Sequence, residues 1–333
     1  MFAWLSTARR RLRSLFRRQS AEYASVVSLM ACMILALGSI VLGLVQHSLI
    51  MQTNGYLTLI DIGNSLLFLA AVQRSMRRPD LTFNYGYGKY ESLAILVSAN
   101  LLLVLTVFTL GEAFSLFQRP PEMRNNIILV VWSVISFIVM RWTARLLERY
   151  AQRYHMPMLH YDAELWRVDS FVEIGVVVGL GASAALHGIK WFGVAAVLDS
   201  VVSIALILVT LKVPLQHGRE AFRQLLDRTL PDEMQYEILA IIAENFTRMC
   251  EFRSVHTRQS GKDIFIEIDL VMPYDYTLQQ LYELEKQILD ALHARFPTAI
   301  PRVYVTPCDG SCELHGTSTC PIKRSLAAPP STP

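Results

Sequence analysis

The chain has 333 residues, of which 53% are hydrophobic and 18% are charged, and its formal net charge at pH 7 is +3. Its mean hydropathy of +0.34 is too high for a typical soluble domain, and the apolar residues are concentrated in the first two thirds of the sequence. The composition therefore argues against an ordinary soluble protein and indicates a membrane protein.

Residues 1–20 form a basic segment before the first apolar run. Its arginines are Arg9, Arg10, Arg11, Arg13, Arg17 and Arg18. A basic cluster directly before a hydrophobic span usually marks the cytoplasmic side. The alternative is a nucleic-acid-binding arm. We favour the first interpretation and expect no nucleic acid as a partner. A secretory signal peptide is not expected, because the apolar run is about as long as a full span and no small-residue cleavage site follows it.

Residues 21–215 are predicted to form an all-α membrane domain with six spans. Each of six apolar segments approaches the length that crosses about 30 Å of hydrocarbon as a helix. The predicted spans are Val26–Val45, Tyr56–Val72, Ser92–Gly111, Asn125–Met140 (extendable through Ala144), Ser170–Leu186 and Trp191–Leu211. Six spans place both termini on the same side of the membrane.

The distribution of basic residues predicts which side that is. The N-terminus and the connections after the second and fourth spans hold most of the arginines and lysines. The other three connections hold only Arg119, Arg124 and Lys190. Since positive residues stay inside, both termini are predicted to be cytoplasmic.

Residues 216–307 are predicted to form an α+β cytoplasmic domain with the element order αββαβ. The expected elements are helix Asp232–Phe246, strands Phe252–Thr257 and Ile264–Met272, helix Thr277–Phe296 and strand Arg302–Thr306. The strand at 264–272 alternates, with Ile264, Ile266 and Ile268 on one side. About ninety residues supply only a modest core, which favours dimerisation.

Residues 308–333 are predicted to be a flexible tail that contains cysteines. Cys308, Cys312, His315 and Cys320 form the pattern C-x3-C-x2-H-x4-C. Thiolates and an imidazole so close together can bind zinc or copper(I), but the spacing is not that of a standard zinc finger. A flexible tail with reduced cysteines is the alternative, and it is slightly favoured.

Two acidic residues, Asp61 and Asp169, lie in or at the edge of predicted spans. A charge at that depth costs several kcal/mol by most estimates, so it usually faces a bundle interior and handles an ion or a proton. The alternative is a structural pair, hydrogen-bonded to neighbouring helices. The sequence therefore favours a transporter with this pair at its centre.

Several motifs resemble the cation diffusion facilitator family, above all its bacterial zinc and ferrous-iron efflux members. They are DIGNSLLFLAAVQRSMRRPD (61–80), NYGYGKYESLAILVSA (84–99), YDAELWRVDS (161–170), LLDRTLPDE (225–233) and HTRQSG (256–261). The likeness runs from Ala21 to Thr306. It implies a homodimer in the inner (cytoplasmic) membrane, a ferredoxin-like cytoplasmic domain, and alternating access that couples cation export to proton uptake.

The family's membrane site is only half present in this sequence. Asp61 and Asp169 match its two closing aspartates, but the ligand positions four residues earlier hold Leu57 and Leu165. Zinc prefers three or four Cys, His or carboxylate ligands in a closed tetrahedron. Two carboxylates and two leucines do not supply that set.

Helical spacing suggests other ligands for the same site. Ser65 and Glu173 follow Asp61 and Asp169 by four residues each, and Asn64 follows Asp61 by three. Such an all-oxygen site suits manganese, ferrous iron less well, magnesium or sodium. We therefore expect the transported cation to be other than zinc, with manganese the first divalent candidate and sodium the monovalent one. The sequence does not name the cation, so Mn²⁺, Fe²⁺, Zn²⁺ and Na⁺ all stay open as substrates. No cofactor is expected.

Two further metal sites of the family are expected to be absent. In the connection after the second span, the histidine positions hold Phe83 and Tyr87, and only Asp80 remains. The places of the cytoplasmic binuclear site carry Arg253, Asp269, Tyr282, Thr306 and Cys308. In contrast, Lys89 and Asp227 match a charged pair that in the family locks the membrane domain to the cytoplasmic domain.

Two functions remain in competition. The first is a cation/proton antiporter, in which Asp61 and Asp169 bind the cation when deprotonated and protons displace it. The second is a non-transporting relict of the fold, acting as a membrane partner or a metal sensor through its tail. An enzyme is not supported, because the sequence shows no nucleophile–base constellation, phosphate loop or HExxH motif.

Overall fold

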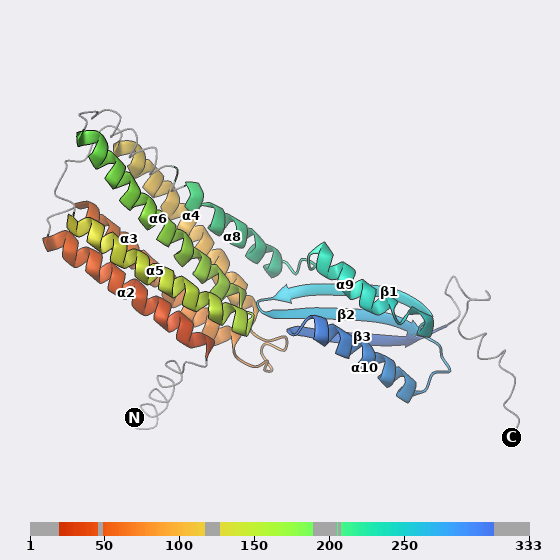
Figure 1. Cartoon of the computed structure of the whole chain (residues 1–333). Helices are drawn as coiled ribbons and strands as arrows, with labels where there is room; N and C mark the ends of the chain where they lie inside the picture. Colours follow the sequence, from red (N-terminus) through yellow and green to blue (C-terminus); the bar gives the residue numbers. More distant parts are fainter. Residues whose placement is uncertain (1–19, 46–48, 117–126, 189–204, 206–207, 310–333) are drawn as a thin grey trace, which may run out of the picture. The chain divides into compact units, whose positions relative to one another are not determined.

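The computed structural model describes residues 20–45, 49–116, 127–188, 205 and 208–309. These residues belong to two compact units, residues 1–223 and 224–333. The first unit is helical and the second combines helices with a sheet (Figure 1).

The long helices of the first unit correspond to the first five predicted spans. Their bounds are α2 Ala21–Val45, α3 Leu49–Ser75, α4 Lys89–Leu116, α5 Ile127–Tyr154 and α6 Pro157–Gly188, and a shorter helix, α8, covers Lys212–Leu225. Most of the sixth predicted span, Trp191–Leu211, lies outside the described residues, and so does Asp199 within it.

Among the described residues, three stretches are long and apolar enough to cross a membrane: Ala21–Leu42, Lys89–Gly111 and Val130–Tyr154. They belong to α2, α4 and α5. The two other long helices, α3 and α6, carry the acidic pair. In α6 the charged residues lie between positions 162 and 173 and lower the hydropathy of that part of the helix; they are Asp162, Glu164, Arg167, Asp169 and Glu173.

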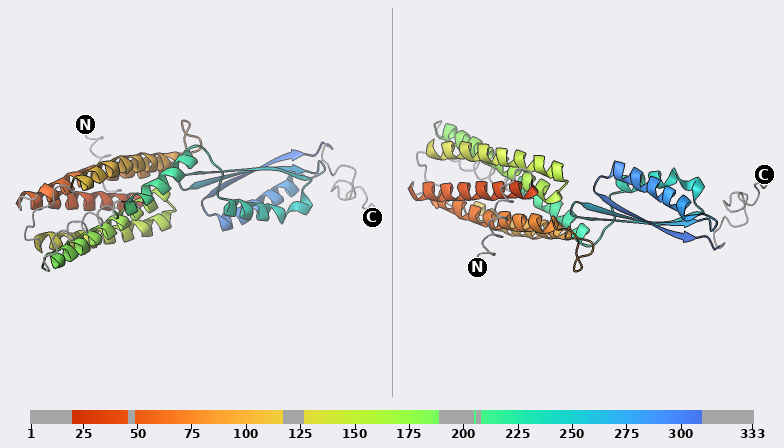
Figure 2. Two further views of the ribbon diagram at one scale, coloured as in Figure 1. Left: turned by 90° about the horizontal axis from the view of Figure 1, so that it is seen from above. Right: turned by 90° about the horizontal axis from the view of Figure 1, so that it is seen from below.

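The bundle is built on two pairs of helices, α2 with α3 and α5 with α6, and further contacts join α2 to α5, α3 to α4 and α4 to α6 (Figures 1 and 2). Its core includes Phe68 of α3, Leu147 of α5 and Tyr161 of α6, each almost fully buried. Most of α8 belongs to the same unit, which extends to Arg223, and Ala221 of α8 is part of this core.

The turn between α5 and α6 is short and explains how the two helices pair. His155 follows the last residue of α5 with φ 51°, the left-handed conformation that often ends a helix, and the Met156 amide donates to the Ala151 carbonyl over 3.1 Å. Pro157 then starts α6, at the first helical position that proline favours. A tight turn of this kind folds α6 back along α5.

The fourth helix is longer than the predicted span. The connection predicted after that span holds Arg141, Arg145, Arg149 and Arg153, but α5 continues to Tyr154 and carries all four. The extension is rich in Ala, Leu, Arg, Gln and Glu, which have high helix propensity, and a Gln152–Glu148 hydrogen bond of 3.1 Å spans one of its turns.

The second unit has the predicted order αββαβ. Its elements are α9 Asp232–Ala243, a short 3-10 turn η1 Phe246–Arg248, β1 Glu251–Ser260, β2 Asp263–Met272, α10 Leu278–Arg295 and β3 Ala299–Pro307. The three strands lie in the order β1-β2-β3, with β1 antiparallel and β3 parallel to β2. The prediction of an α+β domain is confirmed, while β1 and β3 are longer than expected.

Alternation along β2 determines which face of the sheet is covered. Ile264, Ile266 and Ile268 pack in one cluster with Ile238 of α9 and Ile288 of α10. Both helices therefore cover the same face, as Figure 2 shows. The β1–β2 hairpin turns at Gly261, whose φ of 60° suits glycine, and α10 begins with a capping box between Thr277 and Gln280.

Candidate functional site

Asp61 of α3 and Asp169 of α6 lie at the same level of the bundle. The rings of Phe68 and Tyr161 make an edge-on contact, 5.8 Å between centroids, which fixes the register of the two oppositely directed helices (Figure 1). Asp61 is seven residues before Phe68 and Asp169 is eight residues after Tyr161. At about 1.5 Å per residue, both carboxylates lie roughly 10–12 Å from that contact.

The electrostatics of the site agree with this placement. Asp169 lies within electrostatic range of Asp61, Asp162 and Glu173. Asp61 is half-buried and Asp169 is exposed. The structure therefore brings the two predicted carboxylates into mutual electrostatic contact from different helices.

The other predicted oxygen ligands flank this pair. Asn64 and Ser65 are each 5% exposed, and the Oδ1 atom of Asn64 has no hydrogen-bond partner. Glu173 is half-buried, with Ser133 of α5 within hydrogen-bonding reach of its carboxylate. In the part of the chain that the structure describes, no three His, Cys, Asp or Glu side chains are close enough to hold a metal ion together in this conformation.

Leu165, one of the two residues that replace a family ligand, has a packing role. Its side chain is partly buried against the core cluster of the bundle. The side chain of Leu57, the other replacement, lies outside what the structure describes. At the position of Leu165, where the resemblance implies a ligand, the side chain makes an apolar contact.

Sequence reasoning missed the burial of Asp162. In the sequence, His160 and Asp162 precede the fifth predicted span, so residues that attract cations at its mouth and solvated loop residues are equally good interpretations. The structure instead places both in α6, and Asp162 is 4% exposed. The spacing of seven residues puts Asp162 on the same helix face as Asp169, but it gives no signal of burial, because Asp169 is itself exposed.

A second polar group that the sequence did not reveal joins α5, α6 and α8. His160 Nδ1 lies 3.0 Å from a Glu148 oxygen, and Arg167 lies 3.3 Å from the same oxygen. Glu164 pairs with His217 of α8 over 2.5 Å. These contacts put the start of α6 at the end of the bundle where α8 continues toward the cytoplasmic unit.

The loop after α3 uses Asp80 as an internal hydrogen-bond acceptor. Its carboxylate accepts from the amides of Thr82 and Phe83 at 2.9 and 2.8 Å and from the Tyr87 hydroxyl at 2.6 Å. The Tyr87 hydrogen bond, followed by that of the Phe83 amide, holds the pKa of Asp80 below its usual value. The same contact raises the pKa of Tyr87. The loop is thus organised around a phenol–carboxylate pair.

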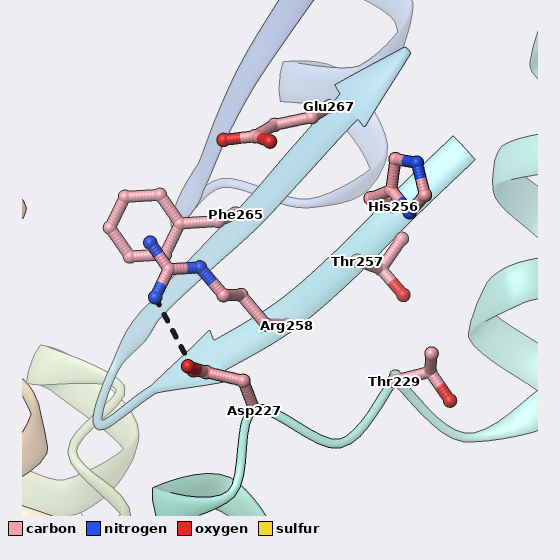
Figure 3. Close-up of a pocket in the computed structure, with 7 residues that line it drawn as sticks. All are labelled: Asp227, Thr229, His256, Thr257, Arg258, Phe265 and Glu267. Atoms are coloured by element: carbon pink, nitrogen blue, oxygen red, sulfur yellow. Dashed lines mark hydrogen bonds and ion pairs between the residues drawn. The ribbon is translucent and has the colours of Figure 1, made fainter. Parts of the chain in front are cut away.

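Asp227, the predicted cytoplasmic partner of Lys89, lines a pocket of the second unit (Figure 3). Its φ is 54°, and its Oδ1 accepts a hydrogen bond from Arg258 at 3.3 Å. The Arg258 guanidinium also lies 4.7 Å from the centre of the Phe265 ring. Thr229, His256, Thr257 and Glu267 complete the lining. Lys89 is the first residue of α4 in the first unit, so the Lys89–Asp227 pair stays a prediction.

The expected places of the family's cytoplasmic metal site are engaged in other contacts. Asp269 accepts a hydrogen bond from Ser254 at 2.8 Å, and Thr306 donates to the Leu270 carbonyl at 3.4 Å. Cys308 is 7% exposed and packs with Cys250 and Val271, while its amide bonds to the Met272 carbonyl at 2.8 Å. Cys308 is therefore part of the folded domain. Cys312, His315 and Cys320 lie outside the described residues.

Comparisons with known proteins agree with this arrangement. Residues 25–226 match the cation efflux transmembrane domain, and residues 230–306 match the cytoplasmic domain of cation efflux proteins, the family's dimerisation domain. Cation-efflux pumps named FieF, from Escherichia coli O127:H6 and Shigella flexneri serotype 5b, are each 29% identical over 258 residues, covering 75% of this chain and 81% of theirs.

A solved structure of CzrB in a Zn form is 28% identical, with a TM-score of 0.24, and covers 26% of this chain and 98% of its own. The family assignment rests instead on the match to the membrane domain, which extends over more than half of the chain. The chain is a multi-pass membrane protein with a cytoplasmic C-terminal domain, and it is a cation efflux transporter, not an enzyme. The chain therefore belongs to the cation diffusion facilitator family.

Proposed function

We propose that this transporter exports a divalent cation in exchange for protons, through a site centred on Asp61 and Asp169. The observation that carries the proposal is the register of α3 and α6. The Phe68–Tyr161 contact brings the two carboxylates to one level, and each is within reach of the other's charge. A divalent cation between them would cancel their repulsion.

The available ligands favour a hard cation, with manganese as the first candidate. Asn64, Ser65 and Glu173 add only oxygen atoms to the two carboxylates. Carboxylate, amide and hydroxyl oxygens suit manganese better than zinc, which is held more often by His and Cys. Leu165 packs into the core where a family member would supply a nitrogen or oxygen ligand. The proposed transporter is therefore not selective for zinc.

Proton coupling follows from the same pair of charges. When the cation leaves, two neighbouring carboxylates repel one another, and a proton on either of them relieves the repulsion. Protons and the cation then compete for the same oxygens, so binding one releases the other. We further propose that the protein works as a homodimer in the inner membrane, with both termini cytoplasmic.

The test is transport by the purified protein in liposomes that contain a pH-sensitive dye. Manganese, ferrous iron, zinc, cobalt and sodium are offered one at a time, with uptake and internal pH recorded together. We expect manganese to move faster than zinc and every transported ion to be accompanied by a proton flux. The variants Asp61→Asn and Asp169→Asn should fall to the level of protein-free liposomes.

Asp290→Asn is the matched control, because it makes the same chemical change at an exposed position of α10. It should transport like the wild type. Equal rates for zinc and the best other cation would refute the ligand argument. Cation flux without any change of internal pH would refute proton exchange, and no flux of any cation would favour the non-transporting alternative.

A further inference from the structure

We propose that Asp162, together with Asn64, forms a cytoplasmic-side station that a cation occupies before it reaches Asp61 and Asp169. This inference rests on the proposed function, since it adds a step to the same path. Asp162 is not one of the positions by which this sequence resembles the metal site of its family. It is assigned from its burial, its hydrogen bonds and its level in the bundle.

The first observation is a buried carboxylate oxygen without a partner. Asp162 is 4% exposed, and its Oδ2 atom is buried with no hydrogen-bond partner. A buried charge normally has its oxygens paired, and leaving one unpaired costs a large desolvation free energy. The unpaired oxygen is therefore available to a ligand that would enter the bundle.

The second observation is that the carboxyl group is held in place from two sides. Ser28 of α2 and Trp166 of α6 are both within hydrogen-bonding reach of Asp162. Trp166 Nε1 also donates to Ser28 Oγ at 2.8 Å. These contacts orient the side chain from α2 and from its own helix, yet they leave Oδ2 unused.

The third observation is a second unpaired oxygen, in Asn64, at a similar position along the bundle axis. Asn64 is 5% exposed, and its Oδ1 atom is also buried without a partner. With Phe68 level with Tyr161, Asp162 lies at about the height of residue 67, and Asn64 is about 4–5 Å further along the axis. Asn64 thus falls between Asp162 and the level of Asp61.

The three acidic groups are also linked through one side chain. Cys32 of α2 lies within electrostatic range of Asp61, Asp162 and Asp169, and the Ser65 hydroxyl is within hydrogen-bonding reach of it. Cys32 is itself buried in the core of the bundle. Asp162, Asp61 and Asp169 therefore all lie within electrostatic range of the same side chain of α2.

The contact between α6 and α8 indicates which end of the path is cytoplasmic. His217 of α8 pairs with Glu164, two residues from Asp162, so the start of α6 lies at the end where α8 continues toward the cytoplasmic domain. Asp169 is seven residues deeper, about 10 Å along the helix axis. A cation arriving from the cytoplasm would meet Asp162 first, then Asn64, and then the carboxylate pair.

The ligand that fits is a partly hydrated divalent cation. One carboxylate oxygen and one amide oxygen can replace only two water ligands, and hard cations such as manganese and magnesium keep several waters when bound this way. Such a station would bind more weakly than the Asp61–Asp169 pair and would pass its ion onward. The competing interpretation is structural, in which Asp162 only ties α6 to α2 through Ser28.

The experiment compares the two faces of the membrane. Wild type, Asp162→Asn and Asp162→Glu are reconstituted in vesicles, and oriented populations are assayed for manganese transport from the cytoplasmic face and, in reverse, from the outer face. We expect Asp162→Asn to raise the KM at the cytoplasmic face by about tenfold, with kcat nearly unchanged and the outer-face KM unaltered. Asp162→Glu should restore most of the affinity.

A structural role would give a different pattern. If Asp162→Asn lowers kcat or shifts KM equally at both faces, or if its KM matches wild type, the station is refuted. Protein yield and melting temperature are recorded for each variant, and Asp162→Glu carries the test if Asp162→Asn does not fold. Retained transport in Asp61→Asn and Asp169→Asn would overturn the proposed function itself, which is a separate result.

Discussion

Trp132 of α5 lies directly over Gly38 of α2, and its Nε1 donates a hydrogen bond to the neighbouring Ser39 hydroxyl at 3.1 Å. A Cβ atom built on Gly38 would lie 2.0 Å from the Trp132 ring. Only glycine allows the indole to approach the α2 backbone so closely. This contact helps to join the two helix pairs of the bundle.

We expect Gly38→Ala to destabilise the membrane domain by about 1–3 kcal/mol, the usual range for overpacking a well-packed interior. The added methyl must displace a large ring that is also tied to Ser39. The measurement is the melting temperature of the purified protein in detergent. Gly111→Ala is the matched control, because a Cβ at Gly111 has no neighbouring atom within 4 Å.

Gly111→Ala should be neutral or slightly stabilising, since alanine has the higher helix propensity. An equal loss in both variants would mean that the detergent-solubilised bundle responds to any helix substitution. Unchanged melting of Gly38→Ala would show that Trp132 moves aside without cost, and the proposed role of the close contact would be wrong.

Tyr87→Phe should alter the pH dependence of stability at both extremes. Asp80 has a lowered pKa, so its contribution is present above its ordinary value of 3.8 and is lost as pH falls through the folded-state pKa. Tyr87 has a raised pKa, so its contribution is present below 10.0 and is lost as pH rises through the folded-state pKa. The melting-temperature difference between wild type and variant should be largest between these limits.

The measurement is a series of melting curves of both proteins from acid to alkaline pH. The difference should narrow at both ends, because a neutral Asp80 or an ionised Tyr87 no longer makes the same hydrogen bond. A difference that stays constant across the whole range would mean that the tyrosine hydroxyl acts through packing, and the account of the Asp80 loop would have to be abandoned.

Local patterns in the sequence predict much of this fold. Alternation at Ile264, Ile266 and Ile268 predicts the covered face of β2, because the period of a strand is two. The length of each apolar run predicts the long helices of the bundle, even where a run contains an acidic residue such as Asp61. Helical spacing predicts Asn64 and Ser65 as neighbours of Asp61, because residues on one helix face recur every three or four positions.

Contacts between distant segments could not be predicted this way. Asp162 has Ser28, far away in the sequence, within hydrogen-bonding reach, and Glu164 pairs with His217. A single sequence contains no signal that joins such residues. The same reasoning missed the extension of α5 to Tyr154, because charged residues in a helix resemble a polar loop when hydropathy is the guide.

Glu237→Gln should weaken the cytoplasmic domain only above acid pH. Glu237 of α9 accepts two hydrogen bonds from Arg295 of α10, at 2.7 and 2.5 Å, which hold the pKa of Glu237 below its ordinary value of 4.5. The contribution of this pair is therefore present above pH 4.5 and is lost as pH falls through the folded-state pKa. Both side chains are solvent-accessible, so the effect should be small and salt-sensitive.

The measurement for this pair is hydrogen exchange of the α9 and α10 amides in the full-length protein, at neutral and acid pH. Glu233→Gln, an exposed change on the same helix, is the control. We expect the α9 amides to exchange faster in Glu237→Gln than in the wild type at neutral pH. The control Glu233→Gln should show no such increase, and neither variant should show it at low pH. Identical exchange of the two variants at every pH would show that the ion pair contributes nothing.

The Glu164–His217 contact should couple α6 to α8 energetically. The two side chains are mostly shielded from solvent, with 28% and 19% of their surface exposed. His217 also lies 5.1 Å from the ring of Tyr161, next to the station proposed at Asp162. Removing either partner leaves the other half-buried without its hydrogen bond, so Glu164→Gln and His217→Ala should each lower stability by about 1–2 kcal/mol.

A double-mutant cycle separates this contact from general damage. If the pair interacts directly, the loss in Glu164→Gln/His217→Ala should be smaller than the sum of the two single losses by about 0.5–1.5 kcal/mol. Chemical denaturation in detergent, followed by tryptophan fluorescence, gives the four free energies of unfolding. Strict additivity would mean that the two helices are held together by packing at Ala221 and its neighbours, and that the His217 imidazole is replaceable.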